Sequence, residues 1–222
     1  AGGSPDIYGG VGRFNEDSID YKDYFKITNE DIGEHIDSKV YFGGGGGNGE
    51  NKVSKGGLGG GGGNAVIDGS STWNNIDGKP NTGGGGSGAV SVDTNGDITT
   101  IRGGNGGSGI VIIRKNMQSP RVRESVIFNS VNLYEYRITK YLYNLANQDS
   151  TGQASYTFTL AETSFCDILS VGGGGGGGSS YHGGNGDSFN DLTRIGGGGA
   201  GGVIFLKDQV IPAGDYTVKV GK

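Results

Sequence analysis

The sequence predicts a mainly β protein whose loops are expanded into ordered glycine-rich segments, and three observations lead to this prediction. Glycine accounts for 51 of the 222 residues and is concentrated in uninterrupted runs, of which the longest is Gly172–Gly178. Short segments rich in β-branched and aromatic residues lead into and out of these runs. Only four prolines are present and there is no strict Gly-X-Y period, so the chain is not collagen.

The glycine runs cannot form an ordinary strand, an α-helix or a side-chain core, because glycine has no side chain to bury and loses the most backbone entropy on ordering. They are either flexible linkers or segments held by backbone contacts alone. The backbone solution is the polyglycine II helix, with about three residues per turn, packed through N–H···O=C and Cα–H···O contacts. Because β-patterned segments alternate with the runs, we expect ordered helices. The shorter runs are Gly43–Gly47, Gly59–Gly63, Gly83–Gly86 and Gly196–Gly199.

The first half of the chain contains short strand patterns between its glycine fields. Residues 1–42 are acidic and rich in tyrosine, and we expect strands at Tyr24–Ile27 and Lys39–Phe42. Residues 89–101 predict a hairpin around the turn pair Asn95-Gly96. The continuous apolar run Ile110–Ile113 is typical of a strand buried on both faces.

The segment 116–150 contains no glycine and has the most conventional composition of the chain. Apolar residues at a period of two favour a strand at Leu133–Ile138, whereas Tyr141–Ala146 is compatible with either a strand or a helix.

The last part of the chain, 151–222, shows clear alternation. Apolar side chains fall on one face of a strand ending at Leu160, and a second strand, Phe165–Val171, runs directly into the longest glycine run. Val203–Leu206 leaves the second glycine field, and Tyr216, Val218 and Val220 alternate after a turn. The predicted fold is therefore a β-sandwich of the jelly-roll or TNF-like kind, whose loops form a packed bundle of polyglycine II helices.

The strands that frame the glycine runs also form a family pattern. The segments that carry it include Tyr156–Leu160, Asp167–Gly178, Gly196–Phe205 and, most specifically, Gly103–Arg114 (GGNGGSGIVIIR). This pattern resembles the glycine-rich domains of bacteriophage tail and adhesin proteins and of related bacterial and large-virus surface proteins. It is more distantly similar to the glycine-rich region of the anaplastic lymphoma kinase receptor. The resemblance implies hexagonally packed polyglycine helices with receptor-contacting loops at their tips.

The order of the segments differs from that family pattern. Its beginning lies at 151–222 and its ending at 1–115, with 116–150 as a connecting segment between two half-modules. The last strand would continue smoothly into the first residues. The chain is therefore a circular permutation, one period of a tandem array, or a processed subunit that completes the module of the next copy. The last two would build a fibre, because an unclosed heterologous contact propagates. The candidate head-to-tail junction is Ala1, Gly2, Gly3, Gly221 and Lys222.

Charge and motif content argue against several other functions. The net charge is −5 with scattered Lys and Arg, so nucleic-acid binding is not expected. No apolar window is long enough for membrane insertion. His35 and His182 lie in unrelated segments, and Cys166 is best interpreted as a buried small hydrophobe. We expect no enzyme activity, no cofactor and no metal site.

We expect a structural protein, extracellular or on the virion surface, that forms or decorates a fibre by head-to-tail assembly with copies of itself. The alternative is a receptor-binding adhesin at a phage tail-fibre tip, with a host-surface glycan or protein as partner. An ice-binding protein is a third possibility, which long insertions in any flat repetitive face disfavour. Rigid aromatic rings beside amides suit sugar or protein recognition, whereas the simpler interpretation is that these rings cap the glycine lattice against water. These candidate tips are Trp73, Asn74, Asn75, Tyr181 and His182.

Overall fold

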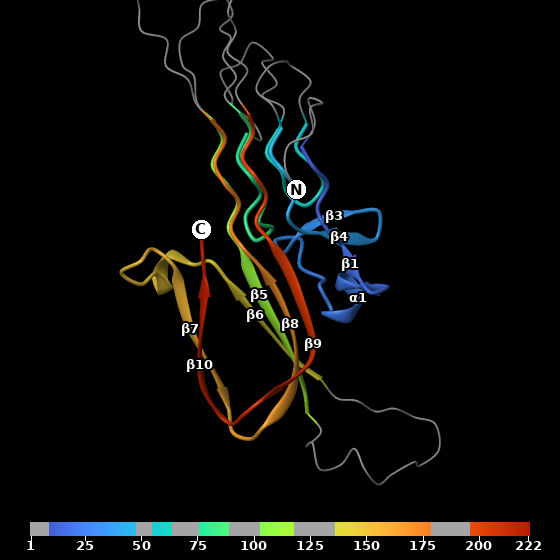
Figure 1. The fold of residues 1–222 in the computed structure, drawn as a ribbon, viewed down its shortest axis with the longest axis vertical. Helices are drawn as coiled ribbons and strands as arrows, with labels where there is room; N and C mark the ends of the chain where they lie inside the picture. The colour runs from blue at the N-terminus through green and yellow to red at the C-terminus, as the bar shows by residue number, and fades with distance from the viewer. Residues whose placement is uncertain (1–8, 48–54, 64–75, 89–102, 118–135, 179–195) are drawn as a thin grey trace, which may run out of the picture.

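A computed structural model describes residues 9–47, 55–63, 76–88, 103–117, 136–178 and 196–222. These residues form mainly β structure, with several small antiparallel sheets and almost no helix, as the sequence predicts (Figure 1). The first elements are β1 (Asn15–Glu16), β2 (Ile19–Asp20), α1 (Tyr21–Tyr24), β3 (Glu34–Ile36) and β4 (Lys39–Tyr41). They are followed by β5 (Ile110–Asn116), β6 (Tyr136–Leu142), a 3₁₀ turn at Leu145–Asn147, β7 (Ala154–Leu160), β8 (Ser164–Val171), β9 (Val203–Ile211) and β10 (Gly214–Val220).

The main sheet has four antiparallel strands in the order β6-β5-β8-β9. Its central strands are buried on both faces because they are apolar at successive positions, so that neighbouring side chains enter different cores. In β5, Ile112 packs in one core and Ile113 in the other. The expected strand at 110–113 and its two-sided burial are therefore confirmed, and so are the strands expected at 165–171 and 203–206.

One face of the main sheet is covered by the N-terminal part of the chain, which carries α1, β3 and β4 (Figure 1). Tyr21, Phe25 and Phe42 are fully buried there against Leu169. Phe205 of β9 meets the ring of Phe25 edge-on, with 5.7 Å between the centroids. This aromatic core fixes the N-terminal segment on the sheet.

The other face is covered by a two-stranded ribbon of β7 and β10, which stands as a separate layer on the left of Figure 1. Ala154, Phe158 and Leu160 of β7 are buried towards the main sheet, which confirms the alternation expected in this strand. In the described residues the ribbon pairs with no strand of the main sheet. There the layers do not close into a sandwich or a jelly roll.

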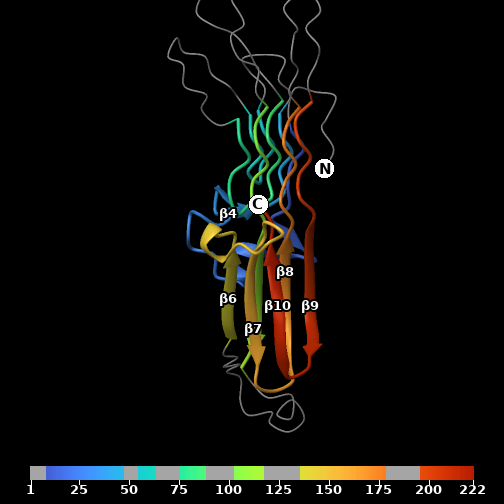
Figure 2. The same cartoon turned by 90° about the vertical axis from the view of Figure 1, so that its left-hand side faces the viewer.

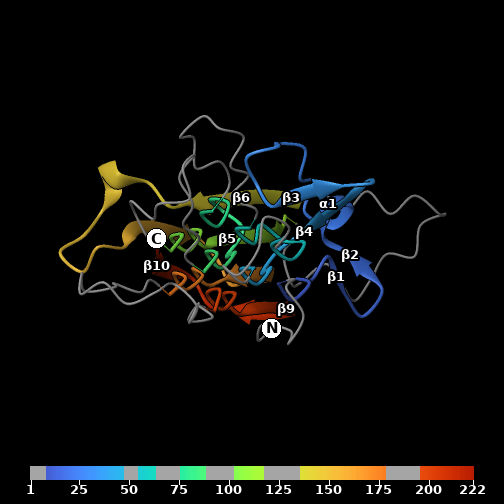
Figure 3. The ribbon, with the colours of Figure 1, turned by 90° about the horizontal axis from the view of Figure 1, so that it is seen from above.

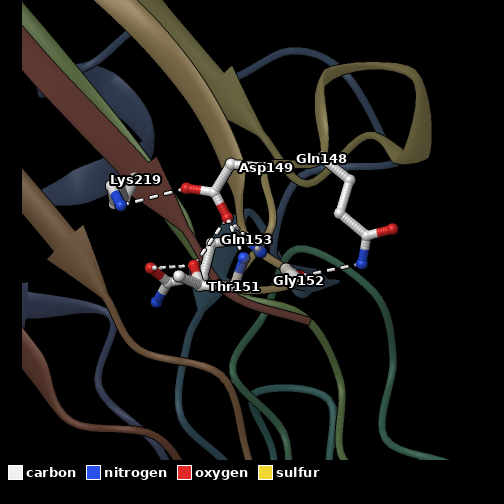
Figure 4. A network of polar contacts seen from close by, with 6 residues as sticks. All are labelled: Gln148, Asp149, Thr151, Gly152, Gln153 and Lys219. Carbon is white, nitrogen blue, oxygen red and sulfur yellow. Dashed lines mark hydrogen bonds and ion pairs between the residues drawn. The ribbon is translucent and has the colours of Figure 1, made fainter.

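The loop before β7 is fastened to β10 through Asp149 (Figure 4). Its carboxylate accepts hydrogen bonds from Oγ1 and N–H of Thr151 at 2.5 and 2.8 Å and pairs with Nζ of Lys219 at 2.9 Å. The Thr151 hydroxyl, followed by Lys219, holds the pKa of Asp149 below its usual range. Gln148 closes the same loop by donating to the carbonyl of Gly152 at 3.0 Å.

The prediction of a strand at Tyr24–Ile27 is wrong, because Tyr24 is the last residue of a helical turn, α1. The side chain of Asp20 accepts from the N–H of Lys22 at 2.8 Å and so caps α1. Tyr21 and Phe25, four residues apart, then enter the core on one side of that turn.

Further sequence expectations have mixed outcomes. The strand expected at Lys39–Phe42 is confirmed as β4, whose last expected residue, Phe42, forms a bridge with Arg13. Of the strand expected at Leu133–Ile138, residues 136–138 are confirmed as the start of β6 and 133–135 lie outside the described residues. At Tyr141–Ala146, β6 ends at Leu142 and a 3₁₀ turn begins at Leu145. The hairpin expected at 89–101 lies outside the described residues. Among those described, no helix is long and apolar enough to cross a membrane.

Candidate functional site

The glycine-rich segments lie side by side beyond one end of the main sheet (Figures 1 and 2). Four of them are continuous with strands of the β structure: β4 leads into the segment that begins at Gly43, β8 leads into Gly172, and β5 and β9 emerge from glycine segments. In Figure 3 they are viewed end-on above the strands. We call them together the glycine bundle, defined as residues 9–12, 43–47, 55–63, 76–88, 103–109, 172–178 and 196–202.

The segment Gly83–Gly88 is bonded to neighbours on all sides. The N–H of Gly85 donates to the carbonyl of Gly44 at 2.8 Å, and that of Gly86 donates to Gly175 at 2.9 Å. Its own carbonyls accept from other segments in turn. The segments bonded to it are 43–47, 60–63, 76–79, 103–109, 172–178 and 196–202. No edge-to-edge sheet gives one segment this many partners, because a strand pairs on two sides only.

The hydrogen bonds between neighbouring glycine segments recur every third residue. Between the two outer segments, the N–H groups of Gly172, Gly175 and Gly178 donate at 2.9, 2.8 and 3.1 Å. Their acceptors are the carbonyls of Gly202, Gly199 and Gly196, respectively. A strand would repeat every second residue and an α-helix would bond within itself. The period of three therefore distinguishes this packing from both.

Glycine is required inside the bundle because the backbones approach too closely for a side chain. A Cβ atom on Gly86 would overlap the carbonyl oxygen of Gly104, and one on Gly198 would overlap that of Gly175. On the outer surface the situation is opposite, since Cβ atoms on Gly196, Gly199 and Gly202 would meet nothing within 4 Å. The open positions again recur every third residue.

Polar side chains hold two chain reversals of the bundle, and one of them, Glu34, also joins the bundle to the β structure. The carboxylate of Glu34 on β3 accepts from the N–H groups of Gly59 and Gly60 at 2.6 and 2.9 Å, where the chain reverses direction. In a second reversal, the buried Thr82 hydroxyl donates to the carbonyl of Lys79 and accepts from the N–H of Gly84. Both reversals lie at the sheet end of the bundle.

The opposite end of the bundle gathers several connections of the chain. Gly47 bonds to Gly62 and accepts from Gly88, and Gly178 bonds to Gly196, so these positions lie at one level, away from the sheet. The described residues that flank 48–54, 64–75, 89–102 and 179–195 therefore lie at this end. The candidate tips Trp73, Asn74, Asn75, Tyr181 and His182 belong to 64–75 and 179–195 and lie outside the described residues.

The candidate junction is described only at its C-terminal side. The carbonyl of Gly221 accepts from the N–H of Gly109 at 3.1 Å, and the carbonyl oxygen of Lys222 lies beside Gly173. Ala1, Gly2 and Gly3 lie outside the described residues. Within this single chain β5 pairs with β8, so the described parts of both half-modules contribute to one sheet.

Of the described groups considered for metal or nucleophilic chemistry, Cys166 is buried and His35 is close to two backbone carbonyls. Burial raises the pKa of the Cys166 thiol, which is 1% exposed, in agreement with a small buried hydrophobe. The Nε2 atom of His35 lies 3.1 Å from the carbonyls of Asn29 and Ile32. In the part of the chain that the structure describes, no three His, Cys, Asp or Glu side chains are grouped to hold a metal ion.

The sequence reasoning missed a buried charge cluster on the main sheet. Asp167 of β8 is 6% exposed and accepts from the Tyr24 hydroxyl at 2.8 Å, from Arg114 Nη1 at 3.1 Å and from the N–H of Asp208 at 2.8 Å. The Arg114 guanidinium also lies 4.0 Å from the ring centroid of Tyr24 and 3.3 Å from that of Tyr136. Burial, followed by the bond to Asp167, raises the pKa of the Tyr24 phenol. The available signal was an aspartate inside the apolar strand Phe165–Val171, which required a buried partner.

Comparison with known proteins identifies one family. The model of the glycine-rich domain matches residues 1–116 and 149–222, which is most of the chain. No curated protein and no solved structure matches it.

Proposed function

Because the chain belongs to the glycine-rich domain family, we propose that it is a non-enzymatic structural protein of an extracellular or virion-surface fibre. In this proposal the glycine bundle is a set of packed polyglycine II helices that forms a stiff rod on the β structure. The bonding of Gly83–Gly88 to segments on all sides carries the proposal. The jelly-roll or TNF-like closure of the β structure stays a prediction.

The period of three is the main support for polyglycine II helices. A helix of about three residues per turn points successive N–H groups at different neighbours and returns to the same neighbour every third residue. The bonds from Gly172, Gly175 and Gly178 to a single neighbouring segment follow this rule. Close backbone packing also satisfies the polar groups that a chain without side chains would otherwise bury unpaired. A bundle of this kind resists bending because each rod is bonded laterally.

Assembly into a fibre is supported by the two edges of the main sheet. β6 and β9 have no strand partner on their outer edges among the described residues. The large apolar side chains of Ile204, Leu206 and Val210 on β9 are also 57%, 44% and 59% exposed. Pairing of β9 in one copy with β6 in the next would continue the sheet and cover part of this surface. Such a contact is head-to-tail, and a head-to-tail contact that does not close into a ring propagates into a fibre.

The experiment is sedimentation of the purified chain over a range of concentrations, with electron microscopy of the same samples. We expect polymers in the wild type and a 22.7 kDa monomer for Leu206→Lys, because a charge on an exposed edge strand opposes pairing. Thr157→Lys, on the exposed side of β7, is the matched control and should polymerise normally. A wild type that stays monomeric at every concentration would refute fibre assembly.

The second candidate, a receptor-binding adhesin, is favoured by the gathering of connections at one end of the bundle. A rigid rod that carries several loops together is suited to presenting them to a host surface. Trp73→Ala is the test, with attachment of the wild-type protein to host cells as the reference. Lost attachment with normal sedimentation would support the adhesin, and unchanged attachment would count against it.

A further inference from the structure

The polar cluster around Asp167 forms one wall of a pocket to which the proposed function assigns no role. The pocket lies on the main sheet, at the end of β5 that is remote from the glycine bundle, and its volume is about 250 Å³. All four strands of the sheet contribute to it, and α1 borders it through Tyr24. Its remaining lining includes Arg114, Asn116, Tyr136, Phe165, Asp167 and Lys207.

Two polar groups of this pocket, Arg114 and Asp167, are held in place before any ligand arrives. Arg114 is fixed by its ion pair with Asp167 and by the two rings that its guanidinium contacts. The side chain of Asp167 is fixed in turn by the N–H of Asp208, at a register shift between β8 and β9. Such fixed donors and acceptors lower the cost of ordering a site on binding.

Charge, size and wall chemistry together define the ligand class. Arg114 and Lys207 are balanced by Asp167 and Asp208, so the pocket favours a neutral ligand over an anion or a cation. Its volume is below the roughly 300–1,000 Å³ of pockets for drug-sized ligands, which limits the ligand to about one ring. Aromatic walls at Tyr136 and Phe165 suit an apolar ring face, while charged and amide groups suit hydroxyls around its rim.

A pyranose has these properties, because its C–H groups form an apolar face and its hydroxyls project from the edge. We propose that this pocket binds a single neutral pyranose unit of a glycan. Arg114 and Lys207 donate to sugar hydroxyls, and Tyr136 packs against the ring. The pocket lies far from the connections that carry the candidate tips, but it shares β6 and β9 with the proposed fibre contact. Sugar binding is therefore measured at a concentration at which sedimentation shows a monomer.

The test is titration of the intact, isotope-labelled chain with methyl glycosides of glucose, galactose, mannose and N-acetylglucosamine, followed by NMR. We expect at least one glycoside to shift the amide signal of Asp208 and the Nε signal of Arg114 with a saturable curve. Tyr136→Ala and Lys207→Ala should each weaken that binding at least tenfold. Lys207 is exposed, so Lys207→Ala should fold normally. Its affinity for the glycoside therefore tests the proposal even if Tyr136→Ala fails to fold.

Lys115→Ala is the matched control, because it removes the same charge from β5 on the opposite side of the sheet. Its affinity should equal that of the wild type. Absence of saturable binding by all four glycosides would overturn the proposal. It would also be overturned by binding that Lys207→Ala leaves unchanged, or by binding of acetate or methylammonium at this pocket in preference to every glycoside.

Discussion

In the β structure, strands bond edge to edge and side chains fill the space between layers, whereas in the glycine bundle the segments bond to neighbours on several sides with no side chain between them. Leu169 is fully buried by other apolar side chains. Gly86 is buried by carbonyl groups of other glycine segments. One chain therefore reaches close packing in two ways, through side chains in the β structure and through backbone in the glycine bundle. Substitutions that change side-chain volume should affect the stability of the two regions in opposite ways. Removing atoms damages the first region, and adding atoms damages the second.

The largest expected effect is removal of a core side chain from the β structure. Phe25→Ala should lower the free energy of unfolding by about 3–5 kcal/mol, because the fully buried ring leaves a cavity. Chemical denaturation monitored by circular dichroism measures this change in the free energy of unfolding. Val11→Ala, at a side chain that is 61% exposed, is the control and should change stability by about 0.5 kcal/mol or less.

The next effect is addition of a methyl group inside the bundle. Gly198→Ala should cost about 3 kcal/mol, because its Cβ would overlap the carbonyl oxygen of Gly175, which is backbone and has no alternative rotamer. The neighbouring Gly199→Ala is the matched control, since its Cβ meets nothing within 4 Å. We expect that control to be neutral or more stable by about 0.4–1 kcal/mol, through reduced entropy of the unfolded chain. Equal effects at both positions would contradict interior packing.

A smaller effect is expected where the two regions are joined. Glu34→Ala removes the carboxylate that accepts from the N–H groups of Gly59 and Gly60, and should cost about 2 kcal/mol, the usual value for hydrogen bonds to a charged group. Glu34→Gln keeps an acceptor oxygen and should cost less. Denaturation curves of the two variants are compared with that of the wild type. An equal loss in both would show that the charge, and not the acceptor, is what matters.

Much of the β structure follows from the sequence because alternation and apolar runs report burial directly. The strands around Ile112, Phe158 and Leu169 were predictable for this reason. The helical turn at Tyr21–Tyr24 was not predictable from periodicity, because its apolar residues are too few to distinguish a period of two from one of four. The cap that Asp20 provides is what indicates a helix there. Where the apolar pattern is this short, the capping residue is a better guide to the secondary structure than alternation.

The type of long-range contact could be predicted from the sequence, but the partner residues could not. The absence of side chains in Gly172–Gly178 indicates backbone packing but cannot identify the neighbouring segment, because every glycine presents the same groups. The pairing of Arg114 with Asp167, 53 residues apart, also depends on strand order and register. One charge in an apolar strand indicates that a partner exists without saying which residue it is.

The most direct test of the account is amide hydrogen exchange of the glycine bundle, resolved by NMR. We predict that the N–H groups of Gly86, Gly107 and Gly175 exchange as slowly as those of Ile112 in β5, because each donates to a carbonyl inside the bundle. Exchange of all three at the rate of an unstructured peptide, with β5 still protected, would contradict it.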